Sequence, residues 1–285
     1  SLYSNVDGIR NSAFGDGALY HNTGGARNTG LGRLAGYYNQ TGGYNIAIGE
    51  SAMTGVSGNS HSNNIAIGYQ SLVGVTTGNN SVAIGHQAGY SNTNGTITAI
   101  GYQAGYSHTG TLYYSVFVGQ FAGKYINSNF NVAVGDLAMG GGDTTASNNG
   151  TSGVTAMGYK AYGGNTGSSD DIDGHSAVAV GANALQNITS GNYNTAVGSS
   201  ALASATTGST NVAVGRKSLE SLTTGGGNVA VGDGTLDNAT TQALYNVAIG
   251  QDTMNGNWTT AAVQDNIGIG RNALSGVLTS ATSGS

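Results

Sequence analysis

The chain has 285 residues and a net charge of −5, and only 7% of its residues are charged, against roughly 25% in typical soluble proteins. There is no basic stripe for binding phosphates, so nucleic acid is not expected as a partner. The absence of cysteine excludes disulfides and thiolate metal sites, and no apolar run reaches the roughly 20 residues of a membrane helix, so this segment is not expected to insert into a membrane.

A five-residue box, close to Asn-Val-Ala-Ile-Gly, recurs fifteen times, most often at a spacing of 17 residues. In chain order, the glycines that end the boxes are Gly15, Gly32, Gly49, Gly68, Gly85, Gly101, Gly119, Gly135, Gly158, Gly181, Gly198, Gly215, Gly232, Gly250 and Gly270. A short repeat of this kind cannot bury its apolar face alone and must stack on its copies, which is the signature of a solenoid.

Each box position has its own residue type. The residue before the glycine is apolar throughout, from Phe14 to Ile269, and the residue two before is Ala or Gly in every box except at Phe117. Val or Ile usually stands three before. This alternation predicts a short strand that ends at each box glycine. The small residues then face away from Val and Ile, either into a flattened coil or towards a neighbouring chain, and the sequence leaves both readings open.

The rest of a 17-residue coil can hold a second short strand and two turns. Every 17-residue interval has a glycine seven positions before the next box glycine, and this position predicts a turn with positive φ. These turn glycines are Gly25, Gly42, Gly78, Gly191, Gly208 and Gly225. The absence of proline is typical of long hydrogen-bonded sheets, because proline lacks the backbone donor.

Asparagine stands four positions before the box glycine in ten boxes, for example at Asn45, Asn64, Asn211 and Asn228. Stacked coils lie about 4.8 Å apart, so these side chains are expected to form a ladder of amides that bond the copies above and below. The sequence therefore predicts an all-β protein, a parallel β-solenoid of about fifteen short coils in a single domain over 1–285. The chain does not begin with Met, which suggests a fragment of a longer fibre protein.

The box, followed three residues later by a small residue, resembles the head repeats of trimeric autotransporter adhesins of the YadA type, from Asn11 to about Leu274. The coils are longer than is usual in that family, and segments such as Gly85 to Ser91 resemble repeats of bacteriophage tail fibres. The resemblance implies a left-handed β-roll, a homotrimer, and an extracellular fibre on a virion or bacterial cell surface that binds a glycan or protein receptor. The local repeat style favours a tail fibre over an adhesin head.

Candidates for chemistry are few. Asp170, Asp171 and Asp173 alternate closely enough on one long coil to offer oxygen ligands to calcium, although the glycine and the distant glutamate of an EF-hand are missing. A polar surface loop is the alternative. No catalytic or cofactor-binding pattern is found, so an enzyme is not expected.

Receptor binding has more candidates. Trp258, the only tryptophan, is flanked by amides that suit a sugar-stacking surface. The two longest coils should form adjacent loops, and their candidate receptor contacts are Asp143, Asn148, Asn165 and His175. Neutral loop variation is the alternative there.

Tyrosines are also numerous, and Tyr69, Tyr102 and Tyr159 directly follow box glycines. They are candidates for sugar stacking as well; alternatively, these rings stack coil on coil and cap the core.

Two further functions stay open. Pairs such as Thr206–Thr207 and Thr223–Thr224 lie at matching positions and could form the Thr ladder of an ice-binding solenoid. The chain could instead be a passive spacer, with recognition in another domain of a longer protein.

Overall fold

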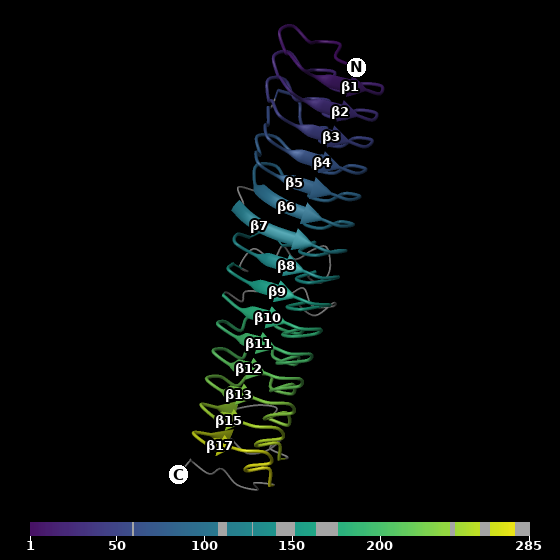
Figure 1. The fold of residues 1–285 in the computed structure, drawn as a ribbon. Coiled ribbons are helices and arrows are strands. Elements are labelled where there is room, and N and C mark those ends of the chain that lie inside the picture. Colours follow the sequence, from purple (N-terminus) through teal and green to yellow (C-terminus); the bar gives the residue numbers. More distant parts are fainter. Residues whose placement is uncertain are drawn as a thin grey trace. The chain divides into compact units, whose positions relative to one another are not determined.

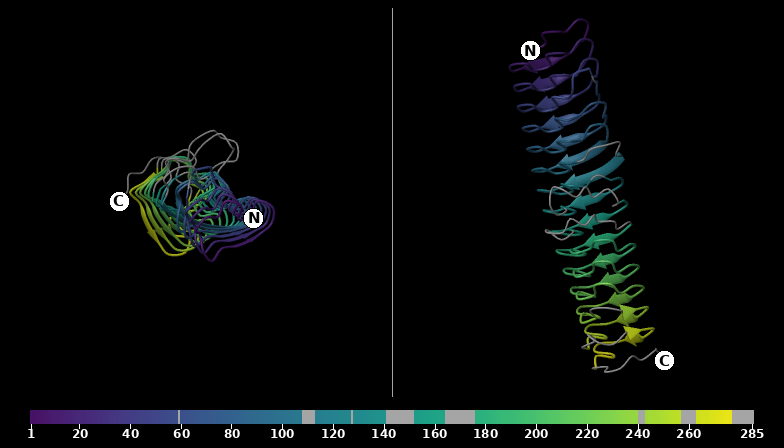
Figure 2. Two further views of the ribbon diagram at one scale, coloured as in Figure 1. Left: turned by 90° about the horizontal axis from the view of Figure 1, so that it is seen from above. Right: turned by 180° about the vertical axis from the view of Figure 1, so that it is seen from behind.

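The computed structural model describes residues 1–58, 60–107, 113–126, 128–140, 152–163, 176–239, 243–256 and 263–276. Over these residues the protein is all-β without helices, a parallel β-solenoid of about 13 turns (Figure 1). The chain divides into two compact units, an N-terminal unit of Ser1–Val134 and a C-terminal unit of Gly135–Ser285. In each unit, successive coils lie one above another (Figure 2).

The strands fall where the boxes predict them. The N-terminal unit contains β1 (Ser12–Phe14), β2 (Thr29–Leu31), β3 (Ile46–Ile48), β4 (Ile65–Ile67), β5 (Val82–Ile84), β6 (Thr96–Ile100), β7 (Tyr113–Val118) and β8 (Val132–Val134). The C-terminal unit contains β9 (Thr155–Met157), β10 (Val178–Val180), β11 (Thr195–Val197), β12 (Val212–Val214), β13 (Val229–Val231), β14 (Ala243–Leu244), β15 (Val247–Ile249), β16 (Val263–Gln264) and β17 (Ile267–Ile269).

Neighbouring box strands pair in parallel with box matched to box, as in Ala47 opposite Ala66 and Ala213 opposite Ala230. The predicted parallel solenoid is therefore confirmed. The number of turns is below the predicted fifteen, since fifteen box strands enclose only fourteen intervals and several intervals include residues outside the described ranges.

The small residue of the box faces the interior, which decides between the two readings that the sequence left open. Ala47, Ala66, Ala213 and Ala230 are fully buried or nearly so, whereas the Val and Ile residues on either side of each alanine are partly exposed. The coil is thus flattened at the strand. Its interior has room for a methyl group there, and the β-branched side chains of the strand point outwards.

The core is filled mainly by side chains on the opposite side of the coil. Where a strand residue is large, the residues that face it in its own and the adjacent coil are small. Phe117, the exception to the small-residue rule, is fully buried. A Cβ atom added at Gly105 or Gly123 would collide with its ring. These glycines occupy the position four after the box glycine, where Leu72 and Leu219 fill the core elsewhere. The large ring at Phe117 therefore occupies the space that two glycines leave free in adjacent coils.

The prediction of positive φ at the turn glycines is wrong. Gly25, Gly42 and Gly208, like the other three, do not have positive φ. A Cβ atom at Gly25 would instead collide with the carbonyl oxygen of Gly42 in the next coil. Glycine is needed there for the close approach of two backbones. The box glycines, in contrast, do have positive φ, for example 135° at Gly215.

The side of the coil that follows the box glycine is not the second strand that was expected. Most of it consists of turns, in which left-handed residues such as Leu34, Ser51 and Met53 recur at every second position. Their backbone groups still bond to the neighbouring coils, as from Ser51 N to Arg33 O at 2.8 Å and from Met53 N to Ser71 O at 2.8 Å. These bonds offset the cost of left-handed backbone at non-glycine residues. Only β14 and β16 form a second short sheet among the described residues.

The asparagine ladder is confirmed. Asn228 Nδ2 and backbone N both donate to Asn211 Oδ1, at 2.9 and 3.1 Å, and Asn45 bonds to Asn28 in the same way at 3.0 Å. The amide nitrogens of Asn45, Asn211 and Asn228 also donate to a backbone carbonyl, as in the bond from Asn211 Nδ2 to the carbonyl of turn glycine Gly225 at 2.9 Å. The ladder therefore satisfies buried backbone groups as well as its own amides.

Candidate interaction surfaces

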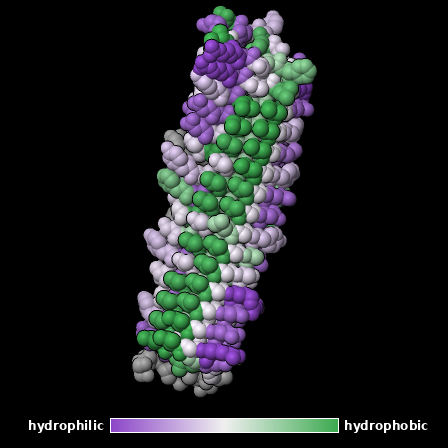
Figure 3. Space-filling model, in the orientation of Figure 1, coloured by the Kyte–Doolittle hydropathy of each residue, from purple (hydrophilic) through white to green (hydrophobic). Residues whose placement is uncertain are grey.

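The outward-facing apolar residues of the box strands form a continuous surface on each unit, which we call the apolar stripe (Figure 3). In the N-terminal unit it consists of Phe14, Leu31, Ile46, Ile48, Ile65, Ile67, Val82, Ile84, Ile100, Val116, Val118, Val132 and Val134. In the C-terminal unit it consists of Met157, Val178, Val180, Val197, Val212, Val214, Val229, Val231, Val247, Ile249, Ile267 and Ile269. Phe14 is 78% exposed and Ile267 is 69% exposed. Contiguous exposed apolar surface makes the stripe a candidate binding face.

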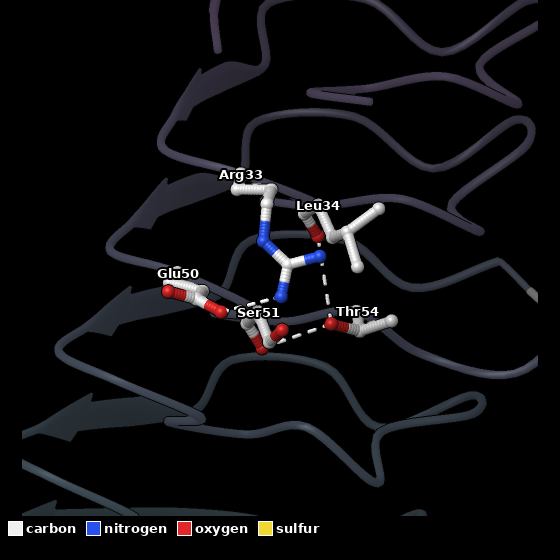
Figure 4. Close-up of polar contacts among 5 residues, drawn as sticks. All are labelled: Arg33, Leu34, Glu50, Ser51 and Thr54. Carbon is white, nitrogen blue, oxygen red and sulfur yellow. Dashed lines mark hydrogen bonds and ion pairs between the residues drawn. The ribbon is translucent and has the colours of Figure 1, made fainter. Parts of the chain in front are cut away.

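Polar residues that directly follow the box glycines border the stripe. In Figure 4, Arg33 Nη2 contacts Glu50 Oε1 of the next coil at 2.5 Å, and the single hydroxyl proton of Thr54 lies between Ser51 O, 2.9 Å from Oγ1, and Leu34 O, 3.4 Å from it. The hydrogen bond and the charge of Glu50 raise the pKa of Arg33. Arg216 and Asp233 form the matching pair in the C-terminal unit, at 2.9 Å. Both pairs are exposed, so they define the border of the stripe without adding much stability.

In the N-terminal unit, the same bordering position carries aromatic rings. The ring centroids of Tyr69 and His86 are 5.1 Å apart, and those of His86 and Tyr102 are also 5.1 Å apart. Tyr69 is 42% exposed and Tyr102 43%. The rings therefore stack coil on coil, as one of the two readings of the tyrosines expected, but they do not cap the core.

A ladder of glutamines runs beside these rings, two positions after successive box glycines. Gln87 Nε2 donates to Gln70 Oε1 at 2.8 Å, and Gln103 Nε2 donates to Gln87 Oε1 at 2.7 Å. This feature was not predicted. The signal was present in the sequence, because Gln70, Gln87 and Gln103 follow three consecutive boxes at the same offset.

A second aromatic row lies five positions after the box glycines. Tyr90 and Tyr106 stack with centroids 4.8 Å apart, and burial raises the pKa of Tyr106 above its usual range. In the next coil, Lys124 Nζ lies 6.0 Å from the ring centroid of Tyr106 and 4.7 Å from that of Phe121. Tyr3, Tyr20 and Tyr37 form a further stack near the start of the unit.

In the threonine pairs, the first threonine uses its hydroxyl group to bond to the next coil. Thr189 Oγ1 donates to Thr206 O at 3.0 Å, and Thr206 Oγ1 donates to Thr223 O at 3.2 Å. Thr23 Oγ1 and Thr76 Oγ1 also bond to carbonyl oxygens of the next coil. The hydroxyl protons of these residues therefore join coil to coil, whereas the second members Thr207 and Thr224 are exposed.

His61 is a buried titratable group inside the N-terminal unit. Its side chain is enclosed, neither ring nitrogen has a hydrogen-bond partner, and burial lowers its pKa from 6.5 to about 4. The backbone N of His61 donates to Asn39 Oδ1 at 3.1 Å. His61 stands seven before Gly68, the position of a turn glycine in the 17-residue intervals, and its coil is two residues longer.

The candidate calcium ligands Asp170, Asp171 and Asp173 and the candidate receptor residues Trp258, Asp143, Asn148, Asn165 and His175 all lie outside the described residues. Among the residues that the structure describes, no three metal-ligating side chains cluster. Within the same ranges, no helix has the length and apolarity to cross a membrane. The described part of the chain therefore offers surfaces as its candidate sites.

No protein-family model matches this sequence, and no curated protein matches it.

Proposed function

We propose that this chain is a structural and adhesive fibre segment without catalytic activity, which assembles with two further copies of itself through the apolar stripe. The observation that carries the proposal is the stripe, because a solenoid that turns Val and Ile outwards at nearly every box needs a partner to cover them. The polar residues that border it, such as Arg33 and Glu50, resemble the rim of a protein interface.

A second copy of the same chain is the partner that fits the stripe. A partner must present apolar side chains at the spacing of stacked coils, about 4.8 Å, over many coils. Another copy of the chain has apolar residues at this spacing, because its own box strands also pair box to box within each unit. The number of three copies and the left-handed course of the coil come from the resemblance to YadA-type heads and phage tail fibres.

The same resemblance supports an extracellular place on a virion or a bacterial cell surface and a role in attachment, with a tail fibre as the preferred setting. An ice-binding solenoid is less well supported, because the hydroxyl protons of Thr189 and Thr206 bond to carbonyl oxygens of the next coil. A passive spacer would use the stripe in the same way and would differ only in lacking a receptor-binding face.

The mass of the purified chain in solution, measured by light scattering after size exclusion, tests the assembly. We expect three times the mass of one chain. The double variant Ile67→Glu and Val231→Glu places a carboxylate on the stripe of each unit and should reduce the mass to that of one chain, since a buried unpaired charge costs several kcal/mol.

The matched control is the double variant Thr77→Glu and Thr207→Glu. It adds the same charges at exposed turn positions outside the stripe and should leave the trimer intact. Circular dichroism checks that all three proteins keep their β-structure. A wild-type chain that is monomeric at micromolar concentration, or a stripe variant that stays trimeric, would contradict the proposal.

A further inference from the structure

Two aromatic rows and the glutamine ladder form one face of the N-terminal unit, which we call the aromatic–amide face. It consists of Tyr69, His86 and Tyr102, of Gln70, Gln87 and Gln103, and of Tyr90 and Tyr106. Phe121 shows how the rows adjoin, because it occupies the glutamine position of the following coil. Its ring centroid lies 5.2 Å from that of Tyr102, and Lys124, five after the box glycine, lies over both Phe121 and Tyr106. The glutamines therefore run between the two aromatic rows.

The glutamine ladder fixes the direction of every amide. Gln87 uses one N–H to reach Gln70 and accepts one bond from Gln103. A primary amide has two N–H donors and two acceptor lone pairs, so Gln87 keeps one donor and one acceptor for a ligand. Hydrogen bonds along the row hold the amides in place before any ligand arrives, which lowers the entropy cost of binding.

The stacked rings contribute edges and hydroxyl groups to the same face. Tyr102 is stacked on His86 and Tyr69 is tilted against it, and the two tyrosines remain 43% and 42% exposed. Each phenol can both donate and accept a hydrogen bond. Donors and acceptors thus alternate with apolar carbon at the spacing of the coils, and they do so along both sides of the glutamine row.

The face carries no formal charge from acidic or basic residues. None of its residues is Asp, Glu, Lys or Arg. At its two ends, Glu50 is paired with Arg33, and Lys124 lies over the rings of Phe121 and Tyr125. A ligand that bears sulfate, phosphate or carboxylate groups along its length would meet Lys124 only at one end of the second row, over Tyr106, and no Lys or Arg elsewhere on the face.

We infer that the aromatic–amide face binds an extended strand of a neutral polysaccharide. Sugar hydroxyls both donate and accept hydrogen bonds, so they match the unused donors and acceptors of the glutamine amides and the phenols. Sugar C–H faces pack against aromatic rings. This inference rests on the proposed attachment function and names the class of ligand. The glutamine row and the second aromatic row lie beyond the border of the stripe, on the side away from it.

Affinity electrophoresis of the full chain in native gels tests the inference, with dextran, hydroxyethylcellulose, galactomannan or laminarin cast into the gel. We expect at least one of these neutral polymers to retard the wild-type protein. Gln87→Glu removes both amide donors, the free one and the one bonded to Gln70, and adds a charge, whereas Tyr102→Ala removes an exposed ring. Each should weaken retardation about tenfold or more.

The control Tyr193→Ala removes a more exposed tyrosine on the C-terminal unit, 64% exposed against 43% for Tyr102, and should not change the retardation. Gln87→Asn keeps the amide but shortens it, so intermediate retardation would confirm that reach matters. The assay reports binding whether or not the chain forms a trimer, so its failure is distinct from failure of the mass measurement. Retardation by none of the four polymers, by acidic polymers such as heparin only, or equally in all variants would overturn the inference.

Discussion

Replacing Asn211 by alanine should cost far more stability than its side-chain size implies. Asn211 is fully buried in the middle of the ladder of the C-terminal unit. Its Oδ1 accepts from the backbone N of Asn228 at 3.1 Å and from Asn228 Nδ2 at 2.9 Å. Its Nδ2 donates to Gly225 O at 2.9 Å and to Asn194 Oδ1 at 3.2 Å.

The magnitude follows from the groups that remain after truncation. Alanine keeps the bond from its own backbone N to Asn194 Oδ1, but it leaves the backbone N–H of Asn228 and the carbonyl of Gly225 buried without these partners. A buried backbone group left unsatisfied costs about 1–3 kcal/mol. Two such groups give an expected loss of about 4 kcal/mol in the free energy of unfolding.

Urea unfolding followed by circular dichroism measures the loss, and hydrogen exchange at the Asn228 amide locates it. Asn238→Ala is the control, since Asn238 is exposed and bonds to Asn255 at the surface, and it should cost less than about 0.5 kcal/mol. If Asn211→Ala costs no more than the control, or if exchange at Asn228 is unchanged, the ladder does not satisfy the backbone as argued.

Two further predictions concern the buried His61 and the box glycines. The pKa of His61 is lowered to about 4, so the unfolded chain binds a proton below pH 6.5 that the folded chain excludes; stability should be full above pH 6.5 and fall by about 3 kcal/mol towards pH 4. In urea unfolding, His61→Leu should remove this fall, and an equal pH dependence in both proteins would contradict it. Gly215→Ala combines a φ of 135° with a collision against the carbonyl of Gly232, whereas Gly270→Ala has a φ of 117° and no atom of the described residues within 4 Å of the added Cβ. The first should cost more than about 3 kcal/mol and the second about 1–3 kcal/mol in thermal or urea unfolding, and equal costs would show that the approach of the coils does not matter.

The repeat makes much of this fold predictable. The box positions locate every box strand, because a period of two with β-branched residues specifies a strand and a fixed spacing specifies its register. The ladder at Asn45 and Asn228 follows from the same register. The stack of Tyr69, His86 and Tyr102 also needs only the common offset from the box glycine.

The direction of the strand faces could not be predicted, because alternation defines two faces but not which of them points inwards. Val and Ile would ordinarily be assigned to the core. Here Leu72 and Leu219 fill the core from the other side and leave room at the strand for alanine only, whereas Phe117 fits because glycines stand at the leucine positions around it. The left-handed backbone at Leu34 and Met53 could not be predicted either. It is stabilised by hydrogen bonds to neighbouring coils, whereas the local conformational preference of these residues is against it.

The match between Phe117 and the glycines at Gly105 and Gly123 sets a limit on how this array can change its length. Where the spacing is 17 and alanine faces inwards, as around Ala213 and Ala230, one coil can be lost or duplicated by recombination and its neighbours still meet equivalent surfaces. Around Phe117, a duplicated or lost coil would either place the phenyl ring against a leucine side chain or leave the space beside Gly105 and Gly123 unfilled. Length variation should therefore accumulate among the regular coils, while the segment around Phe117 is inherited as a block.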